Sequence, residues 1–373
     1  MRAMTLDNLA LLFVPGLGNT TASRLMECVG SAREVLTAPF ARLTTEFGLR
    51  EGVARSITTG ECYRLAEREL EYCRRHDIAV VDVDDDAYPA PLREVVDRPQ
   101  VLFVRGNVEA LKMRMLSMVG TREMSPSGQY IVDKIVGELS AKVADLCIVS
   151  GLAYGVDAAC HRAAIAHNAT TIAVVANALP DVKPAPHRAL AEDIIRHGGA
   201  IVTELHSQSK QNGRLFLARN RIIAAMSMGT LVVESPSEGG SLETADMADG
   251  YHRTVMALPG RVTDSVSFGT NNLIRTGKAR LILTADDIIS DMDWDVGSGC
   301  VEASVVPSAE VLYASLDPAQ RRCVEALGEA EVMDMSQLMR ATGLSIGELM
   351  MALLGLEMQG LVRSLPGQRY ERV

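Results

Sequence analysis

Short apolar segments alternate with amphipathic helical segments from about Ile78 to Asp291, and this alternation constrains the fold more than any other feature. The apolar segments are continuous rather than alternating with polar residues, as in strands that are covered on both faces. Such alternation predicts an α/β fold, a doubly wound and mainly parallel sheet. The expected strands cover residues 101–104, 116–120, 146–151, 170–175, 200–204, 230–235, 254–260 and 280–284.

A helical module is expected before this region, in residues 1–60. Two helices flank a Pro-Gly-Leu-Gly turn at 15–18, and Asn19, Thr20 or Thr21 could cap the second one. A helix-hairpin-helix of this kind can hold a nucleic-acid phosphate on the backbone amides of a helix N-terminus. It can equally be a plain packing module, and the short motif leaves both interpretations open.

A second small module is expected at the C-terminal end. Residues 61–292 form the expected central domain, and residues 293–308, rich in Gly, Ser and acidic residues without a period, predict a linker. Residues 309–373 contain three helical segments and a terminal strand pair, which indicate a winged helix. Its six basic and nine acidic side chains favour a packing or protein-interaction module over a DNA reader.

Composition excludes several classes of protein. No apolar run approaches the roughly 18 residues of a membrane helix, and the first residues do not resemble a signal peptide, so a cytoplasmic protein is expected. Seven scattered cysteines without a CxxC pair indicate reduced thiols rather than a zinc site. The formal net charge of −10 provides no global positive field, so any anion site must be local.

Ligands of a doubly wound sheet bind at the carboxyl ends of its strands, where four segments stand out. Residues 119–122 place Arg122 after a glycine, and 150–157 contain two glycines before a helix. Residues 216–223 bracket an asparagine with two arginines, and 238–244 open a helix with two glycines and a serine. Each segment alone is weak evidence for a binding site, but four such segments at successive strand ends predict an anion-binding site.

Familiar catalytic sites are not expected. Ser150, Asp157 and His161 could be taken for a nucleophilic triad, but the last two are helical neighbours and no nucleophile elbow is present. A capping Asp157 and a structural His161 are favoured. The sequence contains no GxxxxGK[ST] loop, no HExxH, and no GxGxxG after the first strand. No catalytic residue, no metal and no cofactor are therefore expected.

Several motifs together resemble the DNA-processing protein A (DprA, also called Smf) family in order and spacing, over nearly the whole chain. The resemblance includes the segment before the first core strand and the C-terminal winged helix. The motifs are VGTREMSPSGQY, IVSGLAYGVDAACHRAAI, TIAVVANALPDV, ARNRIIAAMS, VVESPSEGGSLETADMA, ALPG with SFGTNNLIRTGKA, and ADDII.

The resemblance implies an extended Rossmann-like domain that binds single-stranded DNA without catalysis. It also implies a homodimer that protects incoming DNA and helps load the RecA recombinase during natural transformation. The N-terminal helices resemble the family's sterile-alpha-motif-like (SAM-like) module, which need not bind DNA. The residues implied to contact DNA phosphates are Gly120, Arg122, Ser150, Gly151, Tyr154, Arg219, Asn220, Arg221, Gly240 and Ser241.

The chain departs from the family pattern at several positions. Tyr154 and Ala218 stand where basic residues are common, and Glu238-Gly239 replaces a usual Lys-Ser pair. Lys183 and His187 occupy positions where Tyr and Asn are typical. Fewer cations should weaken phosphate binding, because each neutralised phosphate contributes through counterion release. Stacking of Tyr154 on a base would offset part of this loss, at about 1–3 kcal/mol.

The sequence is also compatible with two other functions. One is a nucleotide-cleaving enzyme like the lysine-decarboxylase-like or LOG group, although EGGSLET keeps two glycines and Glu243 but lacks the GT step of that motif. The other is an interaction scaffold whose acidic winged helix docks a partner, with vestigial DNA binding.

Overall fold

The computed structural model describes residues 3–210, 212–294, 316–328, 332–358, 362–365 and 369–372. The chain divides into two compact units, Met1–Gly297 and Ser298–Val373. Most of the predicted linker, residues 295–308, lies outside the described residues, and the predicted domain boundaries remain predictions. In the described parts of the chain, no helix is long and apolar enough to cross a membrane.

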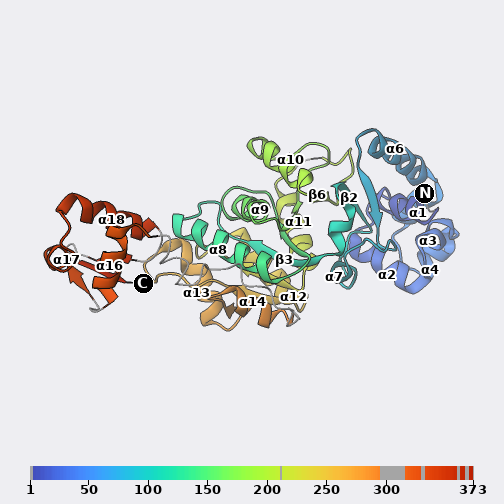
Figure 1. The fold of residues 1–373 in the computed structure, drawn as a ribbon. Coiled ribbons are helices and arrows are strands. Elements are labelled where there is room, and N and C mark those ends of the chain that lie inside the picture. The colour runs from blue at the N-terminus through green and yellow to red at the C-terminus, as the bar shows by residue number, and fades with distance from the viewer. Residues whose placement is uncertain are drawn as a thin grey trace. The chain divides into compact units, whose positions relative to one another are not determined.

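A nine-stranded sheet forms the centre of the first unit, with the order β1-β2-β6-β5-β4-β3-β7-β8-β9 (Figure 1). From β6 to β9 every neighbouring pair is parallel, whereas β1 and β2 join antiparallel at one edge. The predicted doubly wound, mainly parallel sheet is confirmed. The strands are β1 (Ala79–Asp82), β2 (Val101–Gly106), β3 (Arg114–Val119), β4 (Leu146–Ser150), β5 (Thr170–Val174), β6 (Ala200–Thr203), β7 (Gly229–Val232), β8 (Thr254–Ala257) and β9 (Arg280–Leu281).

The chain winds outward in both directions from β3. Strands β4, β5 and β6 follow on one side of β3, and β7, β8 and β9 follow on the other. The pair β3–β7 is therefore the point where the strand order reverses, and a crevice is expected outside the carboxyl ends of these two strands.

Helices cover both faces of the sheet, because each central strand is apolar on both sides. Helices α8, α9, α10 and α14 pack on one face, and α7, α11, α12 and α13 pack on the other. Their bounds are α7 (Ala90–Arg93), α8 (Pro126–Lys142), α9 (Val156–Ala166), α10 (Arg188–Arg196), α11 (Arg214–Met226), α12 (Gly240–Gly250), α13 (Phe268–Arg275) and α14 (Ala285–Asp291), with 3₁₀ helices η1 (Val108–Lys112), η2 (Ala185–His187) and η3 (Ser265–Ser267).

The strand prediction misses β1 and extends β7, β8 and β9 by three residues each. Strand β1 has only four residues and is followed by a run of acidic residues, so its hydrophobic signal is weak. The predicted strands end at 235, 260 and 284, whereas β7, β8 and β9 end at Val232, Ala257 and Leu281. Strand pairing rather than sequence pattern therefore decides where these strands stop.

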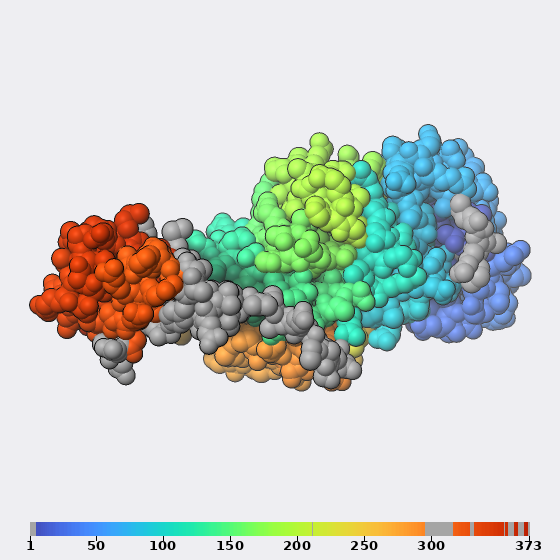
Figure 2. Space-filling view, in the orientation of Figure 1, coloured from blue at the N-terminus to red at the C-terminus, as the bar shows by residue number. Residues whose placement is uncertain are grey.

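The N-terminal helices share a continuous apolar core with the edge of the sheet. Figure 2 shows these blue helices against the adjoining part of the same unit. Helix α2 begins at Asn19, but its N-cap is Gly18 and no side chain caps it, so the expected cap by Asn19, Thr20 or Thr21 is not formed. The helices are α1 (Ala3–Leu12), α2 (Asn19–Val29), α3 (Ala32–Thr37), α4 (Phe40–Thr45), α5 (Glu51–Thr58) and α6 (Glu61–Arg75).

The second unit has the helix and strand order of a winged helix. A three-stranded antiparallel sheet in the order β10-β12-β11 accompanies the helices, and their apolar residues form a separate core. Ile346, Met350 and Met351 are exposed on α18. The elements are α16 (Pro318–Gly328), β10 (Met333–Asp334), α17 (Met335–Thr342), α18 (Ile346–Met358), β11 (Val362–Leu365) and β12 (Arg369–Arg372).

Candidate functional site

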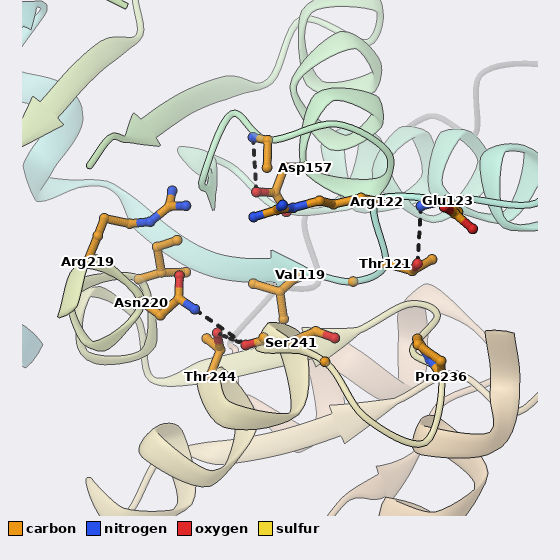
Figure 3. Close-up of a pocket in the computed structure, with 15 residues that line it drawn as sticks. Val119, Thr121, Arg122, Glu123, Asp157, Arg219, Asn220, Pro236, Ser241 and Thr244 are labelled. Carbon is orange, nitrogen blue, oxygen red and sulfur yellow. Dashed lines mark hydrogen bonds between the residues drawn. The ribbon is translucent and has the colours of Figure 1, made fainter. Parts of the chain in front are cut away.

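A cavity of about 410 Å³ opens at the carboxyl ends of β3 and β7, at the point where the strand order reverses. Its walls come from the loops after β3, β4 and β7 and from α11 (Figure 3). The position matches the expectation for ligand sites in doubly wound sheets. The lining residues are Val119, Gly120, Thr121, Arg122, Glu123, Ala153, Asp157, Arg219, Asn220, Ile223, Pro236, Gly239, Gly240, Ser241 and Thr244.

Six of the ten residues predicted to contact phosphates line this cavity, and four do not. The structure brings together six of them from the loop after β3, from α11 and from the start of α12: Gly120, Arg122, Arg219, Asn220, Gly240 and Ser241. Ser150, Gly151, Tyr154 and Arg221 lie outside its lining. The DNA contacts of all ten residues stay predictions.

The loop after β3 is held at its base and leaves the Arg122 side chain exposed. Thr121 N–H donates to the Glu234 carbonyl at 2.7 Å, and the Thr121 carbonyl accepts from Val156 N–H at 3.1 Å. Gly155 has φ +73°, and a Cβ there would lie 2.2 Å from the Thr121 carbonyl oxygen. In the described parts of the chain, the Arg122 guanidinium has no hydrogen bond or ion pair, so it is available to an anion.

Arg219, by contrast, faces the protein interior. Its side chain is 7% exposed, and Nη1 donates to the Gly151 carbonyl at 2.6 Å and to the Val174 carbonyl. Burial lowers the pKa of Arg219, and the nearby Asp157 carboxylate opposes that shift. Burial likewise raises the pKa of the Asp157 carboxyl, opposed by the Arg219 charge. Figure 3 shows Arg122 and Arg219 extending toward Asp157 from opposite sides.

Gly151 makes room for this guanidinium rather than for an incoming ligand. A Cβ at position 151 would lie 2.0 Å from Arg219 Nη1 and 2.6 Å from Asp157 Oδ2. The adjoining Ser150 is fully buried, and its hydroxyl donates to the Met118 carbonyl at 2.7 Å. Both residues therefore bond within the protein at the ends of β3 and β4.

Arg221 is neutralised by carboxylates of the same chain. It forms an ion pair with Glu204, and its Nη1 donates to the Asp97 carbonyl at 2.7 Å. The Asp97 carboxylate lies 4.0 Å from Arg221 Nε. Neither acidic residue was predicted to pair with Arg221, which lies 17 residues from Glu204 and 124 from Asp97 in the chain.

The start of α12 supplies backbone donors to the cavity. Its N-cap is Gly239, and no side chain caps the first N–H groups. The Thr244 hydroxyl donates back to the Gly240 carbonyl at 2.9 Å, and the Ser241 hydroxyl donates to Ser235 Oγ at 2.9 Å. The free N–H groups and the helix dipole together favour an anion at this end.

Exposed aromatic side chains lie on segments that adjoin the cavity. Tyr154, 49% exposed, follows β4 and makes an edge-on contact with the His187 ring at 4.8 Å between centroids. Phe216 is 44% exposed in the first turns of α11, where Asn220 lines the cavity. Phe216 was not predicted as a stacking residue, although an aromatic residue just before two arginines is a usable signal.

The expected absence of a Ser-Asp-His triad agrees with the hydrogen bonding. Asp157 Oδ2 accepts from Ala153 N–H at 3.2 Å, and His161 is fully buried with Nδ1 2.7 Å from Thr171 Oγ1. The Thr171 hydroxyl donates to the Ile148 carbonyl, so Nδ1 must be the donor and Nε2 stays without a partner. Among the described residues, no group of three or more His, Cys, Asp or Glu could hold a metal ion.

Comparison with known proteins identifies similar chains. Residues 79–293 match the family described as DNA recombination-mediator protein A, and residues 307–368 match the DprA winged helix domain. The DNA processing protein DprA of Streptococcus pneumoniae is 36% identical over 210 residues, which are 56% of this chain and 73% of that protein.

Two solved structures are also similar. The X-ray structure of DprA from Streptococcus pneumoniae has a TM-score of 0.65 and 29% identity, and the match covers 78% of this chain and 99% of that one. A structure of DprA from Helicobacter pylori, described by its single-stranded DNA binding mode, has a TM-score of 0.52 and 25% identity. That match covers 58% of this chain and 96% of the other.

Gly151→Ala should destabilise the protein by about 2 kcal/mol or more, because the added methyl displaces a buried guanidinium from its carbonyl partners. Urea unfolding followed by circular dichroism would measure the change. Gly52→Ala is the matched control, since no atom lies within 4 Å of a Cβ there. Equal stability of the two variants would contradict the packing role given to Gly151.

Acidification should destabilise the protein through His161, whose pKa is lowered by burial to about 3 from 6.5. Between these two values the unfolded chain binds a proton that the native state does not, so stability falls as pH falls through this window. The limiting slope is about 1.4 kcal/mol per pH unit. Urea unfolding from pH 7 to 5 should show a weaker pH dependence for His161→Gln, and an unchanged dependence for the exposed His76→Gln.

Proposed function

Because the chain belongs to the DprA/Smf family of DNA-processing proteins, we propose that it is a non-enzymatic protein that binds single-stranded DNA at the switch-point cavity. The observation that carries this proposal is that one cavity joins the uncapped start of α12 to an exposed Arg122, which has no partner among the described residues. A guanidinium and a row of backbone N–H groups suit the phosphate backbone, which every DNA sequence shares.

The distribution of charge indicates that this binding is modest in strength. The charge of Arg221 is matched by Glu204 and Asp97, and Arg219 bonds inside the protein. Arg122 thus carries most of the positive charge that the cavity offers to DNA, and Glu238 opposes it from the adjacent loop. Stacking on exposed Tyr154 and Phe216 would supply binding energy that does not depend on charge.

The wider role is proposed from the resemblance to the family. We infer that the protein protects incoming single strands, helps load the RecA recombinase during natural transformation and recombination, and acts as a homodimer. The single-stranded DNA binding described for the Helicobacter pylori relative supports the DNA part of this role. Co-sedimentation of the chain with RecA and DNA, together with light scattering for the oligomeric state, would test the remaining parts.

A hydrolytic role receives less support than DNA binding. Glu243, the carboxylate that a nucleotide-cleaving enzyme of the LOG type would use, lies in the first turn of α12 but does not line the cavity. Incubation with nucleoside monophosphates, followed by chromatography for the free base, distinguishes the two functions. Release of base would favour the enzyme.

Arg122→Ala should weaken binding of single-stranded DNA for all sequences, because it removes a phosphate contact. The slope of log affinity against log salt should fall by about 0.7. Fluorescence anisotropy of labelled oligonucleotides across a salt series would measure both quantities. The control is Arg55→Ala, an exposed arginine on α5 whose loss should change neither. An unchanged affinity and slope for Arg122→Ala would count against the cavity as the binding site.

Glu238→Lys should strengthen binding of single-stranded DNA and steepen its salt dependence, because it replaces a repelling charge beside the cavity with an attracting one. Glu67→Lys, on exposed surface of α6, is the matched charge reversal far from the loop in sequence. The same anisotropy assay applies. A gain in affinity cannot arise from unfolding, so an equal gain in both variants would point to net charge alone and not to this site.

A further inference from the structure

A buried carboxylate in α6 holds the chain segment that leads into α11. Glu69 is 3% exposed, and it meets Ser207, which follows it by 138 residues. Glu69 Oε1 accepts from Ser207 N–H at 2.7 Å, and Oε2 accepts from the Ser207 hydroxyl at 2.6 Å. In the described residues, both hydrogen-bond donors to this carboxylate come from Ser207. A buried carboxylate is costly without such donors, so Glu69 favours the conformation that keeps Ser207 in place.

Two more contacts from the N-terminal helices fix the same segment. Asn19 Nδ2 donates to Glu204 Oε2 at 2.9 Å, directly after β6. The Phe13 ring lies 4.7 Å from the His206 ring between centroids. Gln208 N–H donates to His206 Nδ1 at 3.2 Å, which closes the turn. Residues 204–208 are therefore held at three separate points, by Phe13 just after α1, by Asn19 of α2 and by Glu69 of α6.

After this anchor the chain enters α11, whose residues Arg219 and Asn220 line the candidate DNA site. Lys210 and Arg214 are exposed, and α11 begins at Arg214. The same helix carries the exposed Phe216 and then Asn220 at the cavity. A cation loses less conformational freedom on meeting a phosphate when contacts in the free protein already restrain the backbone near it.

We propose that Glu69 is a positioning residue for single-stranded DNA binding, which acts by anchoring Ser207 and so holding Lys210 and Arg214, near the start of α11, as further phosphate contacts. The proposal rests on the DNA-binding function proposed above. Glu69 itself touches no DNA. The N-terminal helices thereby contribute to binding through the segment that they hold, without a phosphate contact of their own.

A graded series of substitutions tests the anchor. Glu69→Gln keeps an acceptor for Ser207 N–H and places an amide donor against the hydroxyl, so binding should remain within twofold of the original chain. Glu69→Ala removes both bonds and should weaken binding by about tenfold, the cost of ordering two long side chains on binding. It should also lower the salt slope by about 1.4. The affinity of Ser207→Ala for DNA should lie between the affinities of Glu69→Gln and Glu69→Ala.

Asn8→Ala is the control for general loss of stability. Asn8 is 1% exposed in α1, and its Nδ2 donates to Asp84 Oδ2 at 2.8 Å, away from residues 204–210. Hydrogen exchange of the free protein should show faster exchange around Ser207 in Glu69→Ala but not in Asn8→Ala. Affinity measured below both melting temperatures should fall only for Glu69→Ala. Equal effects of the two variants on exchange and affinity would overturn the positioning role.

A double-mutant cycle connects the anchor to the two cations. The double substitution Lys210→Ala and Arg214→Ala should weaken DNA binding in the original chain. In the Glu69→Ala background, the same double substitution should cause little further loss of affinity. Additive losses would overturn the proposal, because Glu69 would then act elsewhere. If the unmodified chain fails to bind single-stranded DNA at low salt, the proposed function fails as well. If it binds and Glu69→Ala binds equally well, only the positioning role fails.

Discussion

The site depends on one buried guanidinium. Arg219 ties α11 to the carboxyl ends of β4 and β5 by donating to the Gly151 and Val174 carbonyls. A charge in that position needs fixed acceptors, and strand ends provide carbonyl oxygens that no neighbouring strand has used. Gly151 leaves the space, and Asp157 supplies the opposing charge. Because α11 is held in this way, its cavity-lining residues keep a fixed position relative to the ends of the strands.

The sequence predicts the sheet well because its strands are apolar on both faces and its helices lie between them. The ends of the sheet are less predictable, since the four residues of β1 gain their stability from β2 and from the N-terminal helices. Glycine and arginine motifs after β3 and β7 identify most of the cavity, because the carboxyl ends of parallel strands share one edge.

The roles of individual arginines could not be predicted in the same way. Arg219 and Arg221 occupy one motif, yet one bonds to carbonyls across the sheet and the other pairs with Glu204 and Asp97. Their partners lie between 17 and 124 residues away in the chain. A motif therefore identifies which cations are near the site, whereas burial and partner charges decide which of them remain available to a ligand.

Contacts between distant parts of the chain also determine how late in synthesis the N-terminal helices can complete their packing. Glu69 and Asn19 emerge from the ribosome early, but their partners Ser207 and Glu204 follow 138 and 185 residues later. At about 5–20 residues per second, the N-terminal helices wait on the order of ten seconds or more before these partners exist. During that time Glu69 remains solvated. The helical module can therefore form these contacts only after the chain has been synthesised past Ser207, long after its own helices are made.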